Sequence, residues 1–178
     1  MPIKDFVQGE SPPASDFNRY FMQQEFVRKT VNESVSSSTT SQDDDQLWFT
    51  PILNTDYWIT MYIIYDGTGP DPTAGGDLKI SWSVPTGSTF DYISDAITST
   101  ATGGVYDVSR TAQVAPAGGT PGAGTLGTGS PAVALVKGIF RMGSTPGTFQ
   151  FRWSQLTSNA TAVTVRANSC LIARRLTT

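Results

Sequence analysis

The residues that most often carry out chemistry in proteins are scarce in this sequence. It contains no histidine and a single cysteine, Cys170. Histidine is a common general base and metal ligand, so nucleophilic catalysis by Cys170 or by a serine lacks its usual partner. We therefore expect Cys170 to be a small buried side chain rather than a nucleophile.

Carboxylates are the remaining candidates for catalysis or metal binding. Paired carboxylates can hydrolyse glycosidic bonds, but nothing in the spacing of the loop aspartates pairs them. These aspartates are Asp56, Asp66, Asp71, Asp77, Asp91 and Asp95. Three adjacent acids at 43–45 could hold Ca²⁺, but consecutive residues point in different directions and the spaced ligand loop is missing. We expect no enzyme, no cofactor and no metal site, and we expect residues 43–45 to be solvated charge.

The glycine-rich stretch of residues 119–129 resembles two phosphate-binding motifs only in spacing. Residues 122–127 match G-x-G-x-x-G, which needs a following helix and an acidic residue about 20 residues later. The sequence Gly127–Pro131 forbids that helix, and no acid follows Asp107. Residues 119–124 have the glycine spacing of a P-loop but lack its lysine. Neither motif predicts a nucleotide site.

Short segments with strand periodicity fill most of the chain. Apolar and polar residues alternate in 149–154, where Phe149, Phe151 and Trp153 share one face. Turn residues separate the segments at intervals typical of a β-sandwich. The predicted strands cover residues 47–53, 57–65, 77–84, 89–93, 105–114, 132–142, 149–154, 162–165 and 170–176. We predict one all-β domain, because 178 residues suffice for a single sandwich with a substantial core.

The predicted strand at residues 57–65 is apolar on both faces. One face carries Tyr57, Ile59, Met61, Ile63 and Tyr65, and the other carries Trp58, Tyr62 and Ile64. The outer face of a two-layer sandwich is normally polar, so this one must be covered. The candidate covers are an N-terminal helix and a second copy of the sandwich. We favour a subunit interface, because Tyr and Trp tolerate partly polar contacts.

Residues 1–45 are predicted to be an anchoring region ahead of a sandwich head at residues 46–178. Residues 1–13 are predicted to form an arm, in which Phe6 and Val7 are two adjacent apolar residues. Ser15 can cap a helix that reaches about Val35. Its aromatic stripe includes Phe17, Tyr20 and Phe21. This helix packs either on its own domain or on other chains, and residues 36–42 form a Ser/Thr-rich linker.

Two loops rich in glycine and proline, at residues 66–76 and 115–131, lie between predicted strands. Loops at the rim of a β-scaffold often carry binding specificity, and equally often they are passive. Both interpretations stay open. If the loops bind a ligand, Asp66, Asp71, Thr120 and Thr125 are the candidate contacts.

Charge is unevenly distributed along the sequence. Residues 1–107 contain all 15 acidic residues and 5 of the 12 basic ones. The basic residues of the second part are spread singly, so we expect complementary pairing within or between copies rather than nucleic-acid binding. No apolar run approaches the roughly 18 residues of a membrane span, and the first residues contain no apolar signal-peptide core. We therefore expect no membrane insertion and no secretory route.

Several short motifs resemble structural proteins of tailed bacteriophages. The C-terminal motifs are Phe149–Gln155, Ser158–Thr161, Val163–Val165 and Ser169–Arg175. They resemble the ending of jelly-roll modules in phage virion proteins, although Asn168 and Cys170 replace the usual glycine and aromatic residue. The front motifs, Ala14–Tyr20 with Gln24 and Asp44–Leu47, resemble the opening of minor tail and fibre-type proteins of actinobacteriophages.

The resemblance implies a trimeric jelly-roll sandwich, similar to the C1q/TNF fold, that is attached to the virion by its N-terminus. We expect a non-enzymatic homotrimer of the fibre or minor-tail type, assembled in the host cytoplasm. Trp58, Tyr62 and Ile64 would form the trimer interface. Phe6, Phe17, Tyr20 and Phe21 would bind other phage structural proteins, and the rim loops could contact a host-surface glycan.

The alternative is a capsid decoration or head-fibre protein that stabilises the head. Its location on the particle distinguishes it from a tail-associated adhesin. A cellular C1q-like module would be expected to carry collagen-like repeats or a signal peptide, and the sequence shows neither.

Overall fold

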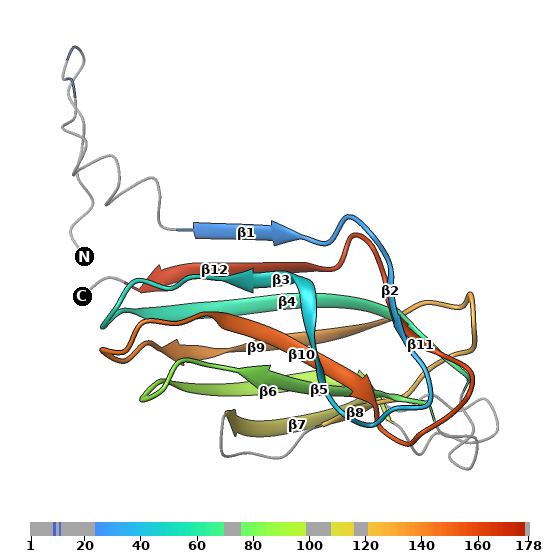
Figure 1. The fold of residues 1–178 in the computed structure, drawn as a ribbon. Coiled ribbons are helices and arrows are strands. Elements are labelled where there is room, and N and C mark those ends of the chain that lie inside the picture. Colours follow the sequence, from blue (N-terminus) through green and yellow to red (C-terminus); the bar gives the residue numbers. More distant parts are fainter. Residues whose placement is uncertain are drawn as a thin grey trace.

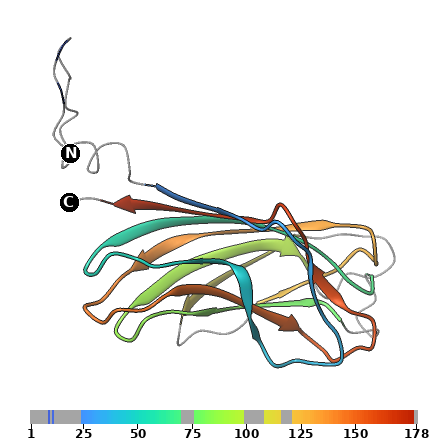
Figure 2. The ribbon, with the colours of Figure 1, turned by 45° about the horizontal axis from the view of Figure 1, so that its top comes forward.

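The computed structural model of the chain describes Gly9, Ser11 and residues 24–69, 76–98, 108–115 and 121–176. Every regular element in these residues is a strand, and the strands form two antiparallel sheets packed as a sandwich (Figures 1 and 2). The predicted all-β fold is therefore confirmed. None of the described segments is a helix with the length and apolarity needed to cross a membrane.

Most strands follow the predicted segments, with additional ones at the N-terminal side and before residue 124. The prediction of a strand at residues 47–53 is correct only for 47–49, because β3 begins at Gln42 and ends at Phe49. They are β1 (Gln24–Arg28), β2 (Glu33–Val35), β3 (Gln42–Phe49), β4 (Asp56–Asp66), β5 (Leu78–Ser83), β6 (Thr89–Ile97), β7 (Val108–Ala115), β8 (Gly122–Ala123), β9 (Ala132–Arg141), β10 (Phe149–Gln155), β11 (Val163–Val165) and β12 (Cys170–Leu176).

The chain alternates between the two sheets. Sheet A has the strand order β1-β12-β4-β9-β6-β7, and β11 pairs with both β4 and β2 at one end. Sheet B has the order β3-β10-β5-β8. Strands β6 and β7 form a hairpin that extends sheet A beyond β9 (Figure 1).

An aromatic cluster joins the two sheets. Trp82 of β5 and Phe149 of β10 come from sheet B, and Phe90 of β6 and Phe140 of β9 come from sheet A. The ring centroids of Trp82 and Phe90 lie 5.1 Å apart, and those of Phe140 and Phe149 lie 4.9 Å apart. Both contacts are edge-to-face, which adds to the free energy gained by burying the rings. The predicted inward face of residues 149–154 is confirmed, because its aromatic side chains are fully buried.

The predicted helix at residues 15–35 is wrong over residues 24–35, which form β1 and β2; residues 15–23 lie outside the described residues. β1 pairs with β12 from Gln24↔Arg174 to Arg28↔Cys170, and β2 pairs with β11. These sheet edges satisfy the backbone groups that a helix would satisfy internally. Val27 in β1 and Val35 in β2 are also β-branched residues, which suit strands.

The expectation that residues 43–45 are solvated is wrong for Asp44, which is fully buried in β3. Lys29 Nζ lies 2.8 Å from Asp44 Oδ2 and 2.7 Å from Glu33 Oε2. Trp153 Nε1 also donates to Asp44, at 3.2 Å. The predicted domain boundary at 45/46 falls within β3. A buried ion pair therefore ties the segment after β1 to sheet B.

Candidate interaction surface

Three exposed aromatic side chains of the described residues lie together on the side of sheet A that faces away from sheet B. They are Phe26, Trp58 and Tyr62. Alternation along β4 buries Tyr57, Ile59 and Met61 in the core and turns Trp58 and Tyr62 outward. We call this side the outer face of sheet A. It consists of Gln24, Phe26 and Arg28 (β1), Cys170, Ile172 and Arg174 (β12), Asp56, Trp58, Thr60, Tyr62 and Ile64 (β4), Val133, Leu135, Lys137, Ile139 and Arg141 (β9), Asp91, Ile93 and Asp95 (β6), and Arg110, Ala112 and Val114 (β7).

The outer face is continuous across the sheet because the strands are in register. Arg174 is the partner of Trp58, and Trp58 is the partner of Ile139. The same row continues through Asp91 to Val114 at the far edge. The side chains of this row are, in order, the guanidinium of Arg174, the indole of Trp58, Ile139, the carboxylate of Asp91 and Val114.

The three largest aromatic side chains on the outer face are widely open. Phe26 is 59% exposed, Trp58 is 53% exposed and Tyr62 is 44% exposed, while Ile64 is half-buried. The N-terminal helix that was a candidate cover does not form over residues 24–35, since β1 extends the same sheet instead of lying across it. An apolar patch of this kind on a described surface is typical of an interaction site.

Charges on the outer face are partly neutralised. Arg141 pairs with Asp91, and the Arg110 guanidinium donates to both carboxylate oxygens of Asp95, at 2.6 and 2.9 Å. The hydrogen bond from Arg110 lowers the pKa of Asp95. Arg174 forms no hydrogen bond or ion pair within the described part of the chain.

The ion pairs agree with the predicted complementary pairing of the two parts of the sequence. Among the described residues, four arginines after residue 107 pair with aspartates before it. The pairs are Arg110–Asp95, Arg141–Asp91, Arg152–Asp43 and Arg166–Asp66. Three of them bring together strands or loops that are far apart in the sequence, so the uneven charge reflects sheet pairing.

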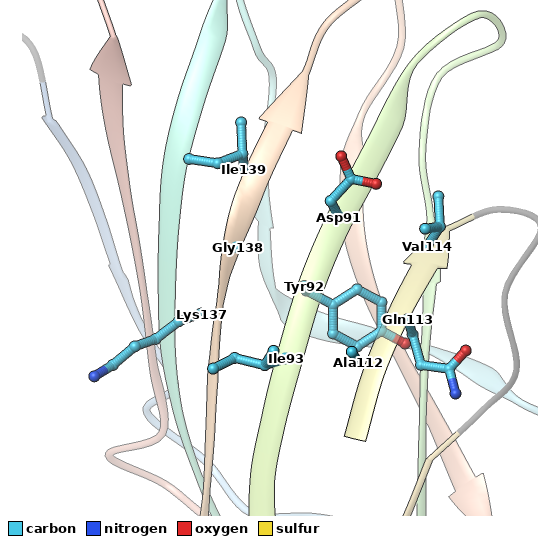
Figure 3. A pocket seen from close by; sticks show the side chains of 9 residues that line it. All are labelled: Asp91, Tyr92, Ile93, Ala112, Gln113, Val114, Lys137, Gly138 and Ile139. Atoms are coloured by element: carbon cyan, nitrogen blue, oxygen red, sulfur yellow. The ribbon is translucent and has the colours of Figure 1, made fainter. Parts of the chain in front are cut away.

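A shallow depression of about 750 Å³ lies on the outer face, across β9, β6 and β7 (Figure 3). Its floor is the backbone at Gly138 and Tyr92, whose neighbours in sequence project outward around it. The lining side chains are Ile139 and Lys137 (β9), Asp91 and Ile93 (β6), and Ala112 and Val114 (β7). The depression is mainly apolar, with one carboxylate and one ammonium group at its rim.

Gly138 is required where β9 crosses the core. A Cβ atom at this position would collide with the backbone oxygen of Asp91 and lie 2.6 Å from Phe90 Cε2. The glycine thus lets Phe90 and Tyr92 stack beneath the sheet, with ring centroids 4.9 Å apart. The β9 backbone at Gly138 therefore lines the depression on the outer face and contacts the aromatic core on the inner face.

Cys170 lies on the outer face, opposite Tyr62 across the β12–β4 pair. It was expected to be buried, and it is half-buried. Burial raises the pKa of its thiol.

Two of the candidate ligand residues, Asp66 and Thr125, are buried at one end of the sandwich. Asp66 Oδ2 accepts hydrogen bonds from Gly129 N, at 2.6 Å, and from Arg166 Nη2, at 2.5 Å. Thr125 is fully buried, and its backbone N donates to Asp77 Oδ1 at 3.0 Å. These polar atoms hold the two loops to each other.

The other predicted contacts lie outside the described residues. They are the loop residues Asp71 and Thr120 and the anchoring residues Phe6, Phe17, Tyr20 and Phe21. In the described residues, no group of three or more cysteine, aspartate or glutamate side chains is arranged to hold a metal ion.

Sequence reasoning identified Trp58, Tyr62 and Ile64 but missed the β6–β7 side of the surface. The signal was present in Asp91, Ile93 and Asp95, which alternate with buried residues. It could not be interpreted without the strand order, because only the pairing of β6 with β9 places these side chains beside Ile139.

The sequence matches no protein-family model and none of the curated proteins with which it was compared.

Proposed function

We propose that this chain is a structural virion protein of a tailed bacteriophage, which forms a homotrimer through the outer face of sheet A. The observation that carries the proposal is the open aromatic surface around Trp58 and Tyr62. Burying these rings against another copy would remove a large apolar area from water, at about 25 cal/mol per Å². Association is the simplest way for such a surface to be stable.

The strand order supports a jelly-roll sandwich within this proposal. In a jelly roll, Greek-key connections alternate between two sheets, so that strands from the beginning and end of the chain become neighbours. Here β1 lies beside β12, and β4 lies between β12 and β9. In sheet B, β10 lies between β3 and β5. The β6–β7 hairpin is an addition at the edge of sheet A.

The C-terminal motifs support the viral part of the proposal. Residues 149–155 and 170–175, which resemble the endings of phage jelly-roll modules, form the central strand β10 and the strand β12. The proposed N-terminal attachment to the virion rests on the resemblance of residues 14–20 and 44–47 alone. A host-surface glycan is not assigned to any residue, because Asp66 and Thr125 use their polar atoms inside the loops.

Labelling of intact particles tests the viral assignment. An antibody against the purified chain, detected with gold particles, should bind phage particles produced by cells that express the encoding genome. Labelling at the tail supports the fibre or minor-tail function, and labelling over the capsid supports the decoration or head-fibre alternative. Particles that contain none of this chain, by labelling and by mass spectrometry, would overturn the virion assignment.

A further inference from the structure

A fully buried lysine lies against two carboxylates where the chain passes from sheet A to sheet B. Lys29, the residue after β1, and Asp44 of β3 have no exposed side-chain surface, and the side chain of Glu33 is 15% exposed. Lys29 Nζ lies 2.8 Å from Asp44 Oδ2 and 2.7 Å from Glu33 Oε2. Apolar side chains can often replace a buried ion pair without loss of stability. Packing alone therefore does not require these three groups.

The two oxygens of the Asp44 carboxylate have different surroundings. Oδ1 accepts hydrogen bonds from the backbone N–H groups of Gln46, at 3.0 Å, and Leu47, at 2.9 Å. Oδ2 accepts from Lys29 Nζ and, at 3.2 Å, from Trp153 Nε1. Two backbone donors on one oxygen can stabilise negative charge that develops there when a nucleophile attacks the carboxyl carbon. The nitrogen bound to Oδ2 is in van der Waals reach of that carbon.

Glu33 is held in place beside the lysine nitrogen. Its Oε2 atom also accepts a hydrogen bond from the backbone N–H of Asp45, at 3.2 Å, and its Oε1 atom accepts one from the side-chain amide of Gln42. Because both Glu33 Oε2 and Asp44 Oδ2 contact the same nitrogen, Glu33 can take a proton from the nitrogen and pass it to Oδ2.

We propose that Lys29 Nζ and Asp44 Cγ join in an isopeptide bond, which the folded chain forms by itself with Glu33 as the proton carrier. A proton first passes from the ammonium group to Oδ2, which leaves a neutral amine and a neutral acid. The amine attacks Cγ, a C–N bond forms, and Oδ1 takes the negative charge. Glu33 then moves a second proton from the nitrogen to Oδ2. The C–O bond breaks, Oδ2 leaves as water, and no oxidation or reduction occurs.

The buried position of the pair favours the bond over its hydrolysis, because bulk water is excluded from Lys29 and Asp44. The bond would also connect the two sheets covalently. The backbone N–H of Lys29 donates to Ser169 O, and the backbone N–H of Asn168 donates to Lys29 O, both at 2.8 Å. These contacts fix Lys29 to the turn before β12 of sheet A, whereas Asp44 belongs to sheet B. The reaction needs no cofactor and no partner chain.

Proteolysis of the denatured wild-type chain with trypsin and a glutamate-specific protease, followed by mass spectrometry, tests the bond. Without the bond, trypsin cleaves after Lys29 and residues 30–33 are released as a free peptide. With the bond, Lys29 is not a cleavage site, and residues 29–33 stay attached to residues 34–79. The branched fragment should have the summed mass of the two peptides less one water molecule. Complete release of residues 30–33 from a chain that was folded before digestion would overturn the proposal.

Two aspartate variants provide a matched comparison. Asp44→Ala removes the carboxyl carbon that is attacked, so residues 30–33 should be released completely. Asp43→Ala removes only the neighbouring carboxylate, which pairs with Arg152, and the branched fragment should remain. A branched fragment of unchanged mass in Asp44→Ala would place the bond elsewhere and overturn the assignment. The wild-type digest decides the proposal even where a variant fails to fold.

The variant Glu33→Gln tests the proton carrier. It keeps both bonded residues, and we expect bond formation to slow by about a hundredfold or more, since a positioned general base contributes at least that factor. Trypsin alone measures the linked fraction at intervals after expression, because the linked chain gives residues 29–79 less one water and the unlinked chain gives residues 30–79. Far-ultraviolet circular dichroism confirms that the variant is folded. A folded variant that forms the bond as fast as the wild-type chain would overturn the role of Glu33.

Discussion

At the scale of single residues, buried charge is the feature that the sequence pattern concealed. Lys29, Asp44 and Trp153 meet in the interior, although they come from three distant parts of the chain. Asp44 stands in a run of three aspartates, which suggests a solvated segment. Its carboxylate is instead hydrogen-bonded by Lys29, by Trp153 and by the backbone of Leu47. The burial of a charge depends on partners that periodicity does not reveal.

Separate substitutions of Asp44 and of its neighbour Asp43 compare the contributions of a buried and an exposed ion pair to stability. Asp44→Ala leaves Lys29 buried with one carboxylate fewer, so we expect a loss of about 3–5 kcal/mol in the free energy of unfolding. Asp43 forms an exposed pair with Arg152, so Asp43→Ala should cost at most about 1 kcal/mol. Urea unfolding of both variants measures the difference, and similar losses would contradict a structural role for the buried pair.

The carboxyl group of Asp77 gives a pH-dependent prediction. Burial raises its pKa above 3.8 in the folded chain, while hydrogen bonds from Thr125 oppose the increase. The folded state then binds a proton more tightly than the unfolded state, so this group lowers stability as pH rises from 3.8 through the raised pKa. Asp77→Asn keeps the acceptor oxygen and removes the charge.

Over that pH range, we expect the variant Asp77→Asn to become progressively more stable relative to the wild-type chain. Above the raised pKa, the difference should be constant. Urea unfolding of the two proteins at a series of pH values measures it, and the contributions of other acids cancel in the comparison. A difference that does not change with pH would show that Asp77 is not destabilised by burial.

At the scale of elements, β9 connects the core to the outer face. Its inward side packs Phe140 against Phe149, and its outward side carries Lys137 and Ile139. Gly138 is the one glycine within this strand, and it allows β9 to approach Phe90 of β6 closely. An alternating pattern predicts that a strand exists, but the need for a glycine follows from the close approach of the β6 backbone at Asp91 and of the Phe90 ring.

Substitution of Gly138 tests this packing. Gly138→Ala places a Cβ against the backbone oxygen of Asp91 and the ring of Phe90, and we expect a loss of about 1–3 kcal/mol in the free energy of unfolding because the paired backbone of β6 must shift. Lys137→Ala, at the adjacent exposed position, is the control and should change stability by about 0.5 kcal/mol or less. If Gly138→Ala were as stable as the wild-type chain, the close packing of β9 on β6 would be contradicted.

The strands were predictable from sequence where one face is buried, as in β4 and β10. Aromatic residues alternate in β10 and fill both faces of β4, and the short length of both segments, bounded by turn residues, favours strands. The strands β1 and β2 were missed because their stability comes from pairing with β12 and β11, not from their own periodicity. The surface around Trp58 was predicted, whereas the β6–β7 part of it required knowledge of the sheet order.

At the scale of the whole molecule, the described part of the chain leaves one side of the sandwich, the outer face of sheet A, uncovered. Sheet A is wider than sheet B, and its outer face carries the exposed rings of Phe26, Trp58 and Tyr62. The four described ion pairs between the two parts of the sequence neutralise much of the charge. The proposed interface between copies would cover the exposed rings.

Sedimentation equilibrium of the purified chain, compared with the double variant Trp58→Asp/Tyr62→Asp, tests the central claim most directly. We expect the wild-type chain to sediment at three times its mass of 19.1 kDa. The variant should sediment as a folded monomer, because both substitutions are on the outer face and leave the core unchanged. A wild-type chain that is a well-folded monomer of 19.1 kDa at every concentration would contradict the claim that copies cover the outer face.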